Sequence, residues 1–127
     1  MFEKLDDDDK LFLAAAVAIG KNDYEKAIAL LSSSLEKNPH DFESLRLLAE
    51  CYDEFGDPIQ ALIALKEAQK LEPLNGQILA YLGNMYFRLF LYELAIPVLK
   101  KTLELGEIEE DIYFNLAFSY FGLNKVN

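Results

Sequence analysis

Residues 42–75, FESLRLLAECYDEFGDPIQALIALKEAQKLEPLN, contain the pattern that decides the fold. Four side chains at i, i+3, i+4 and i+7 define one face of an α-helix: Leu45, Leu48, Ala49 and Tyr52. A second helical stripe follows at i, i+4 and i+7: Ala61, Leu65 and Ala68. Between the stripes, Gly56 suits a left-handed helix end, Asp57 a cap and Pro58 the first position of a new helix. The stretch therefore predicts a helical hairpin.

The same pattern recurs every 34 residues along the chain. The recurring sets are Leu11, Leu45, Leu79 and Tyr113; Ala15, Ala49, Gly83 and Ala117; and Ala27, Ala61 and Ala95. Ala49 and Ala61 are expected where the two helices of a hairpin cross, because small side chains allow the backbones to approach closely. A fixed repeat of this length indicates a stacked array, in which no single unit can bury its own apolar face.

These repeats resemble the tetratricopeptide repeat (TPR) family. The family pattern W-x2-L-G-x2-Y…A-x3-F…P appears in the second repeat as Leu45-x2-Leu48-Ala49-x2-Tyr52…Ala61-x3-Leu65…Pro73. The third reads Leu79-x2-Leu82-Gly83-x2-Tyr86…Ala95-x3-Leu99, and the first Leu11-x2-Ala14-Ala15-x2-Ala18…Ala27-x3-Leu31…Pro39. Leucine replaces the family's tryptophan throughout, and Glu107 stands where a third proline would fall.

The resemblance implies an all-α fold, a right-handed α-solenoid of antiparallel helix hairpins with three TPR units plus the first helix of a fourth. We expect an acidic N-terminal tail over 1–8 and a TPR domain over 9–127, with repeats at about 8–41, 42–75 and 76–109 and a partial repeat at 110–127. The implied function is that of a scaffold or adaptor, which binds a peptide segment of a partner protein in its concave groove.

Composition excludes several other classes of protein. With 12 basic and 22 acidic residues, the net charge is −10, so we expect no nucleic-acid partner. The longest apolar run, 11–19, is much shorter than the roughly 20 residues that span a bilayer, so we expect no membrane insertion. Cys51 is the only cysteine, which favours a reducing, cytoplasmic location and a packed thiol.

Catalytic and metal-binding chemistry lack the residues that they need. His40, the only histidine, lies in a turn without partners at metal-ligand spacing. Glu50, Asp53 and Glu54 share one helix face, but no nucleophile accompanies them. We therefore expect no enzyme activity, no metal and no cofactor.

Residues about 100–140° away from the packing stripe are expected to face the groove. The predicted peptide-binding residues are Phe12, Arg46, Glu50, Asp53, Gln77, Asn84, Phe87, Arg88, Phe114, Phe118 and Phe121. The groove would be acidic near Glu50, although these acids also fit a simple solvated face, and aromatic near Phe118. The carboxylate clamp of some family members is not matched, since Asp111 stands where a lysine is needed.

The last predicted helix carries two apolar stripes. We expect Tyr113, Leu116, Ala117 and Tyr120 to form its packing face, and Phe114, Phe118 and Phe121 to remain outside it. Burying each phenylalanine would contribute roughly 1.5–3 kcal/mol, so a peptide, another protomer or a further helix should cover them. Leu13 and Val17 add apolar surface to the first helix. The sequence thus favours a piece of a longer array or a homo-oligomer formed through the terminal helices.

Several alternatives stay open at this level. Besides an adaptor, the chain fits a small acidic secretion-type chaperone or a self-assembling structural TPR unit. Residues 6–10, DDDDK, match the enteropeptidase site used in expression vectors, and equally provide an N-cap and negative charge at a helix start. Pro97 falls just past the first turn of its predicted helix, and should kink the helix or delay its start.

Overall fold

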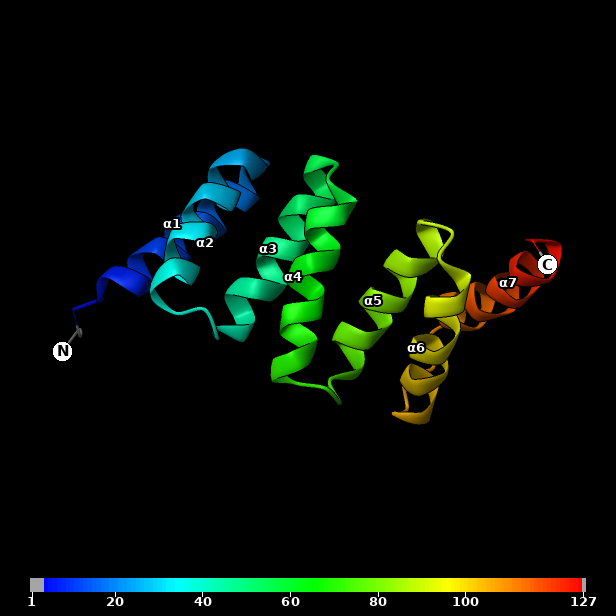
Figure 1. Ribbon diagram of the computed structural model, residues 1–127. Helices are drawn as coiled ribbons and strands as arrows, with labels where there is room; N and C mark the ends of the chain where they lie inside the picture. Colours follow the sequence, from blue (N-terminus) through cyan, green and yellow to red (C-terminus); the bar gives the residue numbers. More distant parts are fainter. Residues whose placement is uncertain (1–3, 127) are drawn as a thin grey trace. The chain divides into compact units, whose positions relative to one another are not determined.

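The computed structural model describes residues 4–126, and side chains up to Asn124; this part of the chain contains seven α-helices and no strand (Figure 1). The chain divides after Leu71 into two compact units. The helices of the first unit are α1 (Asp7–Gly20), α2 (Tyr24–Lys37), α3 (Phe42–Phe55) and α4 (Pro58–Leu71). Those of the second unit are α5 (Gly76–Arg88), α6 (Tyr92–Glu104) and α7 (Glu110–Val126). The all-α class is confirmed.

The first unit consists of two helical hairpins, α1–α2 and α3–α4, and α2 packs against α3 (Figure 1). Small residues occupy the predicted crossings, where Ala49 and Ala61 are both 0% exposed. Ala15 and Ala27 are buried in the same way in the preceding hairpin. Because alanine leaves room for close backbone contact, the hairpins pack as the repeat pattern predicts.

Side-chain caps explain where several helices begin. The Asp41 carboxylate accepts hydrogen bonds from the backbone N–H and the hydroxyl of Ser44, at 3.5 and 2.9 Å. Asp57 accepts from the Gln60 N–H at 3.2 Å, and Pro58 is the first residue of α4, as predicted. Asp6 accepts from the Asp9 N–H at 2.8 Å, so α1 begins at Asp7, inside the stretch expected as an acidic tail.

The turn inside each hairpin has one geometry, which recurs at the 34-residue interval. Its central residue has a positive φ: 59° at Asn22, 98° at Gly56 and 61° at Phe90. In each turn the next N–H donates to the carbonyl five residues earlier, from Asp23 to Ala18, Asp57 to Tyr52 and Leu91 to Tyr86, all at 2.8 Å. Glycine and asparagine tolerate this conformation, whereas Phe90 adopts it at a cost of about 1 kcal/mol or more.

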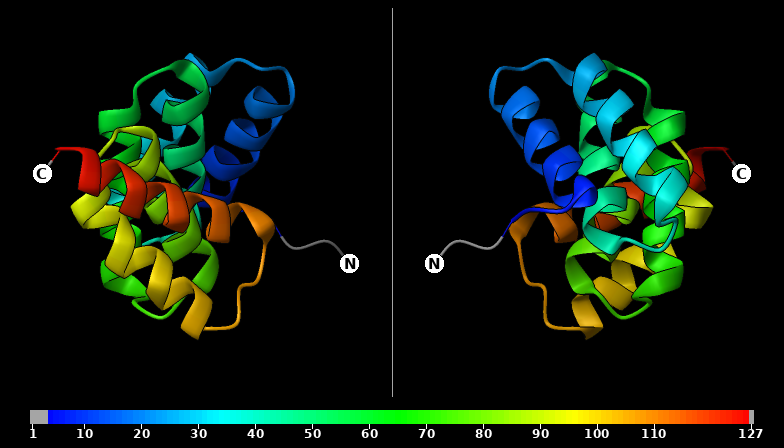
Figure 2. Two further views of the ribbon diagram at one scale, coloured as in Figure 1. Left: turned by 90° about the vertical axis from the view of Figure 1, so that its right-hand side faces the viewer. Right: turned by 90° about the vertical axis from the view of Figure 1, so that its left-hand side faces the viewer.

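The second unit consists of the α5–α6 hairpin and α7. Leu79, Leu82 and Leu99 are buried between the hairpin's helices, and a Cβ on Gly83 would lie only 2.6 Å from the Leu99 Cδ2. Residues 105–109, orange in Figure 2, link α6 to α7, which packs mainly against α6 and also contacts α5. Gly83 is therefore required for the close approach of α5 and α6.

The packing face of α7 differs from the prediction. Its buried residues are Ile112, Asn115 and Ser119, whereas Leu116 is half-buried and Tyr113, Ala117 and Tyr120 are exposed. In α3 and α5 the corresponding face is covered by the second helix of the same hairpin, but within residues 4–126 no such helix follows α7. Helix α7 instead buries the side that faces the preceding hairpin, so the predicted stripe was wrong for this helix.

Pro97 lies within α6, exposed to solvent. Of the two predicted effects of Pro97, the delayed start does not occur, because the helix begins at Tyr92, and the kink stays a prediction. Proline leaves the carbonyl of Glu93 without its usual helical donor. Glu93 is also exposed, so water can hydrate that carbonyl, and the helix tolerates the proline on its solvent side.

Candidate functional site

Six aromatic side chains of the second unit form one connected surface. We call it the aromatic surface; its members are Phe87 of α5, Phe90 of the following turn, Tyr92 of α6, and Phe114, Phe118 and Phe121 of α7. Phe114, Phe118 and Phe121 share one face of α7, since they follow at i, i+4 and i+7. Three consecutive helices and a turn thus contribute to a single surface.

Phe118 lies at the centre of the aromatic surface. Its ring centroid is 5.5 Å from Phe114, 5.9 Å from Phe121 and 6.0 Å from Phe87. The surface continues from Phe87 to Tyr92 and from Tyr92 to Phe90, both at 6.3 Å. Most of these pairs meet edge-on or tilted, which is the geometry that aromatic quadrupoles favour. The rings therefore hold one another in place without a ligand.

Much of this aromatic area remains open to solvent. The exposed fractions are 76% for Phe90, 60% for Phe114, 53% for Phe121 and 45% for Phe118. Since covering apolar area contributes about 25 cal/mol per Å², these rings retain a large capacity for stabilising a bound partner. A contiguous exposed apolar surface of this kind is typical of an interaction site.

Gly122 allows the Tyr92 ring to pack closely against α7 at one edge of the aromatic surface. A Cβ on Gly122 of α7 would collide with the Tyr92 ring. The ring therefore lies directly on the α7 backbone, and Tyr92 connects the start of α6 to the end of α7. This contact holds Phe87 and Phe90, which both contact Tyr92, beside the phenylalanines of α7.

Two exposed carboxylates neighbour members of the aromatic surface in the sequence. Asp111 is exposed three residues before Phe114, on the same side of α7, and Glu93 is exposed directly after Tyr92. The chain as a whole carries a charge of −10. This arrangement favours apolar ligands that also carry lysine or arginine.

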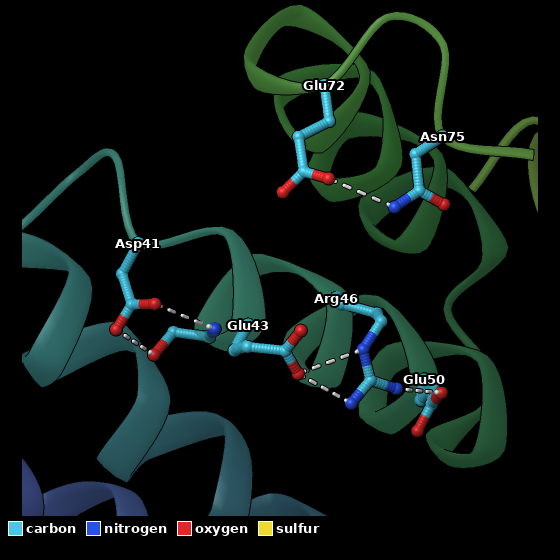
Figure 3. Close-up of polar contacts among 7 residues, drawn as sticks. Asp41, Glu43, Arg46, Glu50, Glu72 and Asn75 are labelled. Atoms are coloured by element: carbon cyan, nitrogen blue, oxygen red, sulfur yellow. Dashed lines mark hydrogen bonds and ion pairs between the residues drawn. The ribbon is translucent and has the colours of Figure 1, made fainter. Parts of the chain in front are cut away.

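In the first unit, two of the predicted polar residues, Arg46 and Glu50, pair with each other. Arg46 binds Glu43 through Nη2 at 2.8 Å and Glu50 through Nη1 at 2.9 Å (Figure 3). The hydrogen bond to Glu43 is the main reason why the pKa of Arg46 is raised, and Glu50 adds to it. Surface pairs of this kind contribute about 0.3–0.5 kcal/mol each. The Arg46–Glu50 pair thus offers less uncompensated charge than the sequence suggests.

The remaining predicted residues have varied surroundings. Phe12 and Asp53 are half-buried in α1 and α3, while Gln77 and Arg88 are exposed near the two ends of α5. Asn84 is half-buried, and its Oδ1 accepts a hydrogen bond from the Asn115 Nδ2 at 3.2 Å. At the start of the second unit, Asn75 caps α5 and its amide donates to Glu72 at 3.1 Å (Figure 3). The Asn84–Asn115 hydrogen bond connects α5 to α7, and the Asn75 contacts fix the start of α5.

Four of the six members of the aromatic surface were among the predicted peptide-binding residues: Phe87, Phe114, Phe118 and Phe121. Phe90 and Tyr92 were not predicted. A signal for Phe90 was available in the repeat register. Its position corresponds to Asn22 and Gly56, the turn residues of the earlier hairpins. An aromatic residue at a position that suits glycine or asparagine conflicts with local propensity, and such conflicts often mark functional residues.

Cys51 is buried in α3. Burial, helped by the Glu50 carboxylate, raises the pKa of its thiol to about 11, so the thiol is protonated at neutral pH. This state fits the predicted packed role. Within the described part of the chain, no cluster of three or more His, Cys, Asp or Glu side chains suits a metal ion. None of the helices described is long and apolar enough to cross a membrane.

Antiparallel hairpins that repeat every 34 residues, with small residues at each crossing, define a helical-repeat protein of the protein-interaction class. The tetratricopeptide repeat family model matches residues 18–85, just over half of the chain. The chain belongs to the TPR family, and its architecture is that family's all-α solenoid.

Known proteins with similar sequences or structures agree with this family assignment. DnaJ homolog subfamily C member 3 from Gallus gallus is 34% identical over 122 residues, which cover 96% of this chain and 24% of that protein. The crystal structure of the P58(IPK) TPR domain is 29% identical with a TM-score of 0.83, over 93% of this chain and 33% of that one. MamA protein, at 23% identity, has a TM-score of 0.86 over 91% and 63%. The chain spans about a quarter of the length of the curated relatives it matches.

Proposed function

We propose that this chain is a TPR scaffold or adaptor that binds a peptide segment of a partner protein without catalysing a reaction. The aromatic surface would hold the segment's apolar side chains. The observation that carries the proposal is the set of four exposed phenylalanines on one aromatic surface: Phe114, Phe118 and Phe121 are in ring contact, and Phe90 is connected to them through Tyr92 and Phe87. Membership of a protein-interaction family supports it.

The segment that fits this surface combines leucine or phenylalanine with lysine or arginine. The apolar residues would cover the rings around Phe118, and the basic residues would approach Asp111 and Glu93. An acidic segment would meet like charge, which costs affinity. The ligand preference therefore follows from both the rings and their acidic surroundings.

We further propose that the first helices of both units contribute to peptide binding. In the first unit, Phe12 would contact apolar groups of the ligand and Arg46, Glu50 and Asp53 its polar groups. In the second unit, Gln77, Asn84 and Arg88 would add further polar contacts. A reducing compartment such as the cytoplasm suits this module, since its one cysteine is a buried free thiol.

Self-association is a second candidate function, and one observation favours it. Leu13 and Val17 of α1 are exposed, and so are Tyr113 and Tyr120 of α7. Apolar faces on both terminal helices could join copies of the chain head to tail. Sedimentation analysis separates the two functions, because a monomeric chain that binds peptide supports the adaptor, whereas polymers without peptide binding support assembly.

A pair of labelled peptides tests the proposed function. Both contain the same leucine and phenylalanine core, flanked by lysines in one and by glutamates in the other. We expect the lysine-flanked peptide to bind more tightly, and Phe118→Ala to weaken its binding about tenfold or more, as for a central hot-spot residue. Fluorescence anisotropy measures both affinities.

The matched control is Phe55→Ala, which removes another exposed phenylalanine, from α3 of the first unit. We expect this variant to retain the parent affinity within about twofold, a change that would indicate no direct contact. If the two variants weaken binding equally, or if neither does, the aromatic surface is not the binding site. Tighter binding of the glutamate-flanked peptide would contradict the proposed ligand chemistry.

A further inference from the structure

Helix α4 of the first unit has exposed apolar residues on the side opposite to its packing face. Ile59 and Ile63 lie one helical turn apart on this side, and Phe55 ends α3 just before the turn that leads into α4. All three side chains are more than half exposed. The buried Leu65 lies on the other side of α4, where the helix packs against α3 (Figure 1).

The fold does not require apolar residues at these three positions. In the first repeat the corresponding residues are Lys21, Glu25 and Ala29, and all of them are exposed. In the third repeat, Glu93 and Pro97 stand in place of the two isoleucines, and both are exposed. Isoleucine is also a poorer helix former than alanine or glutamate. Since neither burial nor helix propensity explains the isoleucines, they indicate a binding role.

Lysines continue the apolar stripe toward the end of α4. Lys66 and Lys70 follow Ile59 at i+7 and i+11, so they share its face of the helix, and both are exposed. Lys70 pairs with Glu67 at 2.8 Å. With two lysines and one glutamate, α4 carries a charge of +1 in a chain whose charge is −10. The stripe therefore changes from apolar to positively charged along the helix.

We propose that this stripe is a second docking surface, which binds a segment of a partner protein that combines apolar side chains with aspartate or glutamate. We call it the α4 surface; it consists of Phe55, Ile59, Ile63, Lys66 and Lys70. The segment's apolar residues would cover the two isoleucines, and its carboxylates would pair with the lysines. This goes beyond the proposed function, because the aromatic surface favours basic segments. The adaptor would thus bind two chemically different segments, one on each unit.

Other occupants fit the α4 surface less well. The first hairpin is followed by another, and yet Lys21, Glu25 and Ala29 remain exposed, so continuation of the repeat array leaves these positions uncovered. A second copy of the chain, or an anionic lipid surface, would meet the chain's charge of −10 and be repelled. A short segment with a few carboxylates brings far less like charge.

A labelled peptide whose leucine and phenylalanine core is flanked by glutamates is the probe. We expect saturable binding to the intact chain, with roughly micromolar or weaker affinity because the interface is small. Ile59→Glu should weaken binding about tenfold or more, because it removes apolar area and adds like charge. Glu25 and Glu93 occupy the corresponding positions of two other repeats, so the variant should fold normally, which circular dichroism checks.

A charge reversal tests the electrostatic part of the proposal. Lys66→Glu should weaken binding of the glutamate-flanked peptide several-fold, and the difference from the parent chain should shrink as salt is added. The lysine-flanked peptide should not lose affinity for this variant. Equal affinities of Lys66→Glu and the parent chain at low salt would contradict the proposed charge complementarity.

Two controls separate the α4 surface from the rest of the chain. Val17→Glu makes a similar change at an exposed position of α1 and should not change the affinity. Phe118→Ala reports on the aromatic surface, and binding of the glutamate-flanked peptide should withstand it, so the two sites can fail independently.

The proposal is overturned if the glutamate-flanked peptide does not saturate the chain at about millimolar concentration. It is also overturned if Ile59→Glu leaves binding unchanged, or if Val17→Glu weakens it equally. Loss of binding through Phe118→Ala would assign the peptide to the aromatic surface instead. A dimer that Ile59→Glu dissociates, or binding to phosphatidylserine vesicles that Ile59→Glu abolishes, would equally contradict the proposed occupant.

Discussion

Helices α3 and α7 share nearly the same sequence stripe, which packs against a second helix only in α3, and their outward faces differ in chemistry. Leu48, Ala49 and Tyr52 of α3 recur as Leu116, Ala117 and Tyr120 of α7. Over the same interval, the outward residues Arg46, Glu50 and Asp53 are replaced by Phe114, Phe118 and Phe121. One helical scaffold thus presents a polar surface in the second repeat and an aromatic surface in the fourth.

The two surfaces differ in how far their side chains are already paired within the chain. In α3, the one positive charge of Arg46 is paired with both Glu43 and Glu50, and the outward face keeps a net negative charge. In α7, Phe114 and Phe118 contact each other, but both remain largely exposed. Exposed apolar area gains stability only when another molecule or another element covers it, which is why we propose the aromatic surface of the second unit as the binding site.

The largest expected effect concerns the alanines that these two helices share. Ala49→Leu should destabilise the fold by about 1–3 kcal/mol, because the residue is fully buried beside α4 and the added side chain overpacks the crossing. Ala117→Leu should change the stability by less than about 0.5 kcal/mol, since Ala117 is exposed. Urea denaturation measures both free energies of unfolding. Equal destabilisation by the two substitutions would show that the face of α7 around Ala117 is covered in solution.

A smaller effect on stability, of opposite sign, is expected from a substitution at Phe90. Phe90→Gly should stabilise the fold by about 0.5–1 kcal/mol, because glycine adopts the positive φ without steric cost, and the ring that it removes is mostly exposed. The same substitution should weaken binding of the lysine-flanked apolar peptide. Thermal unfolding and anisotropy test the two effects together.

Asn22→Gly is the control for this change, at the corresponding turn of the first hairpin. Its effect on stability should be only a few tenths of a kcal/mol, since asparagine already tolerates the conformation. A clear loss of stability in Phe90→Gly would mean that the ring supports the fold, and would contradict its assignment to the binding surface.

Much of the fold follows from local sequence signals. The left-handed turn at Gly56, the cap at Asp57 and the helix start at Pro58 were all predicted, because each depends on the chemistry of a few neighbouring residues. The buried alanines at the crossings followed from the 34-residue interval. Repeat proteins are favourable for such reasoning, because every unit contacts mainly its neighbours.

The features that sequence reasoning missed depend on what covers each element. The pattern of Tyr113, Ala117 and Tyr120 matches a packing face, but it cannot indicate whether a helix packs there. Tyr92 joins the aromatic surface through its contact with Gly122, across two helices. The phenylalanine stripe of α7 was visible from its spacing alone, whereas the groove along the first helices of all repeats remains a prediction.

Hydrogen–deuterium exchange of the intact chain, with and without the lysine-flanked apolar peptide, tests the central claim most directly. We expect peptide binding to slow exchange of backbone amides in α7 and around Phe90, because bound peptide would cover and stabilise the aromatic surface. Exchange in α3 around Arg46 and Glu50 should change much less. Protection confined to α3, with α7 unaffected, would contradict the assignment of the binding site to the aromatic surface.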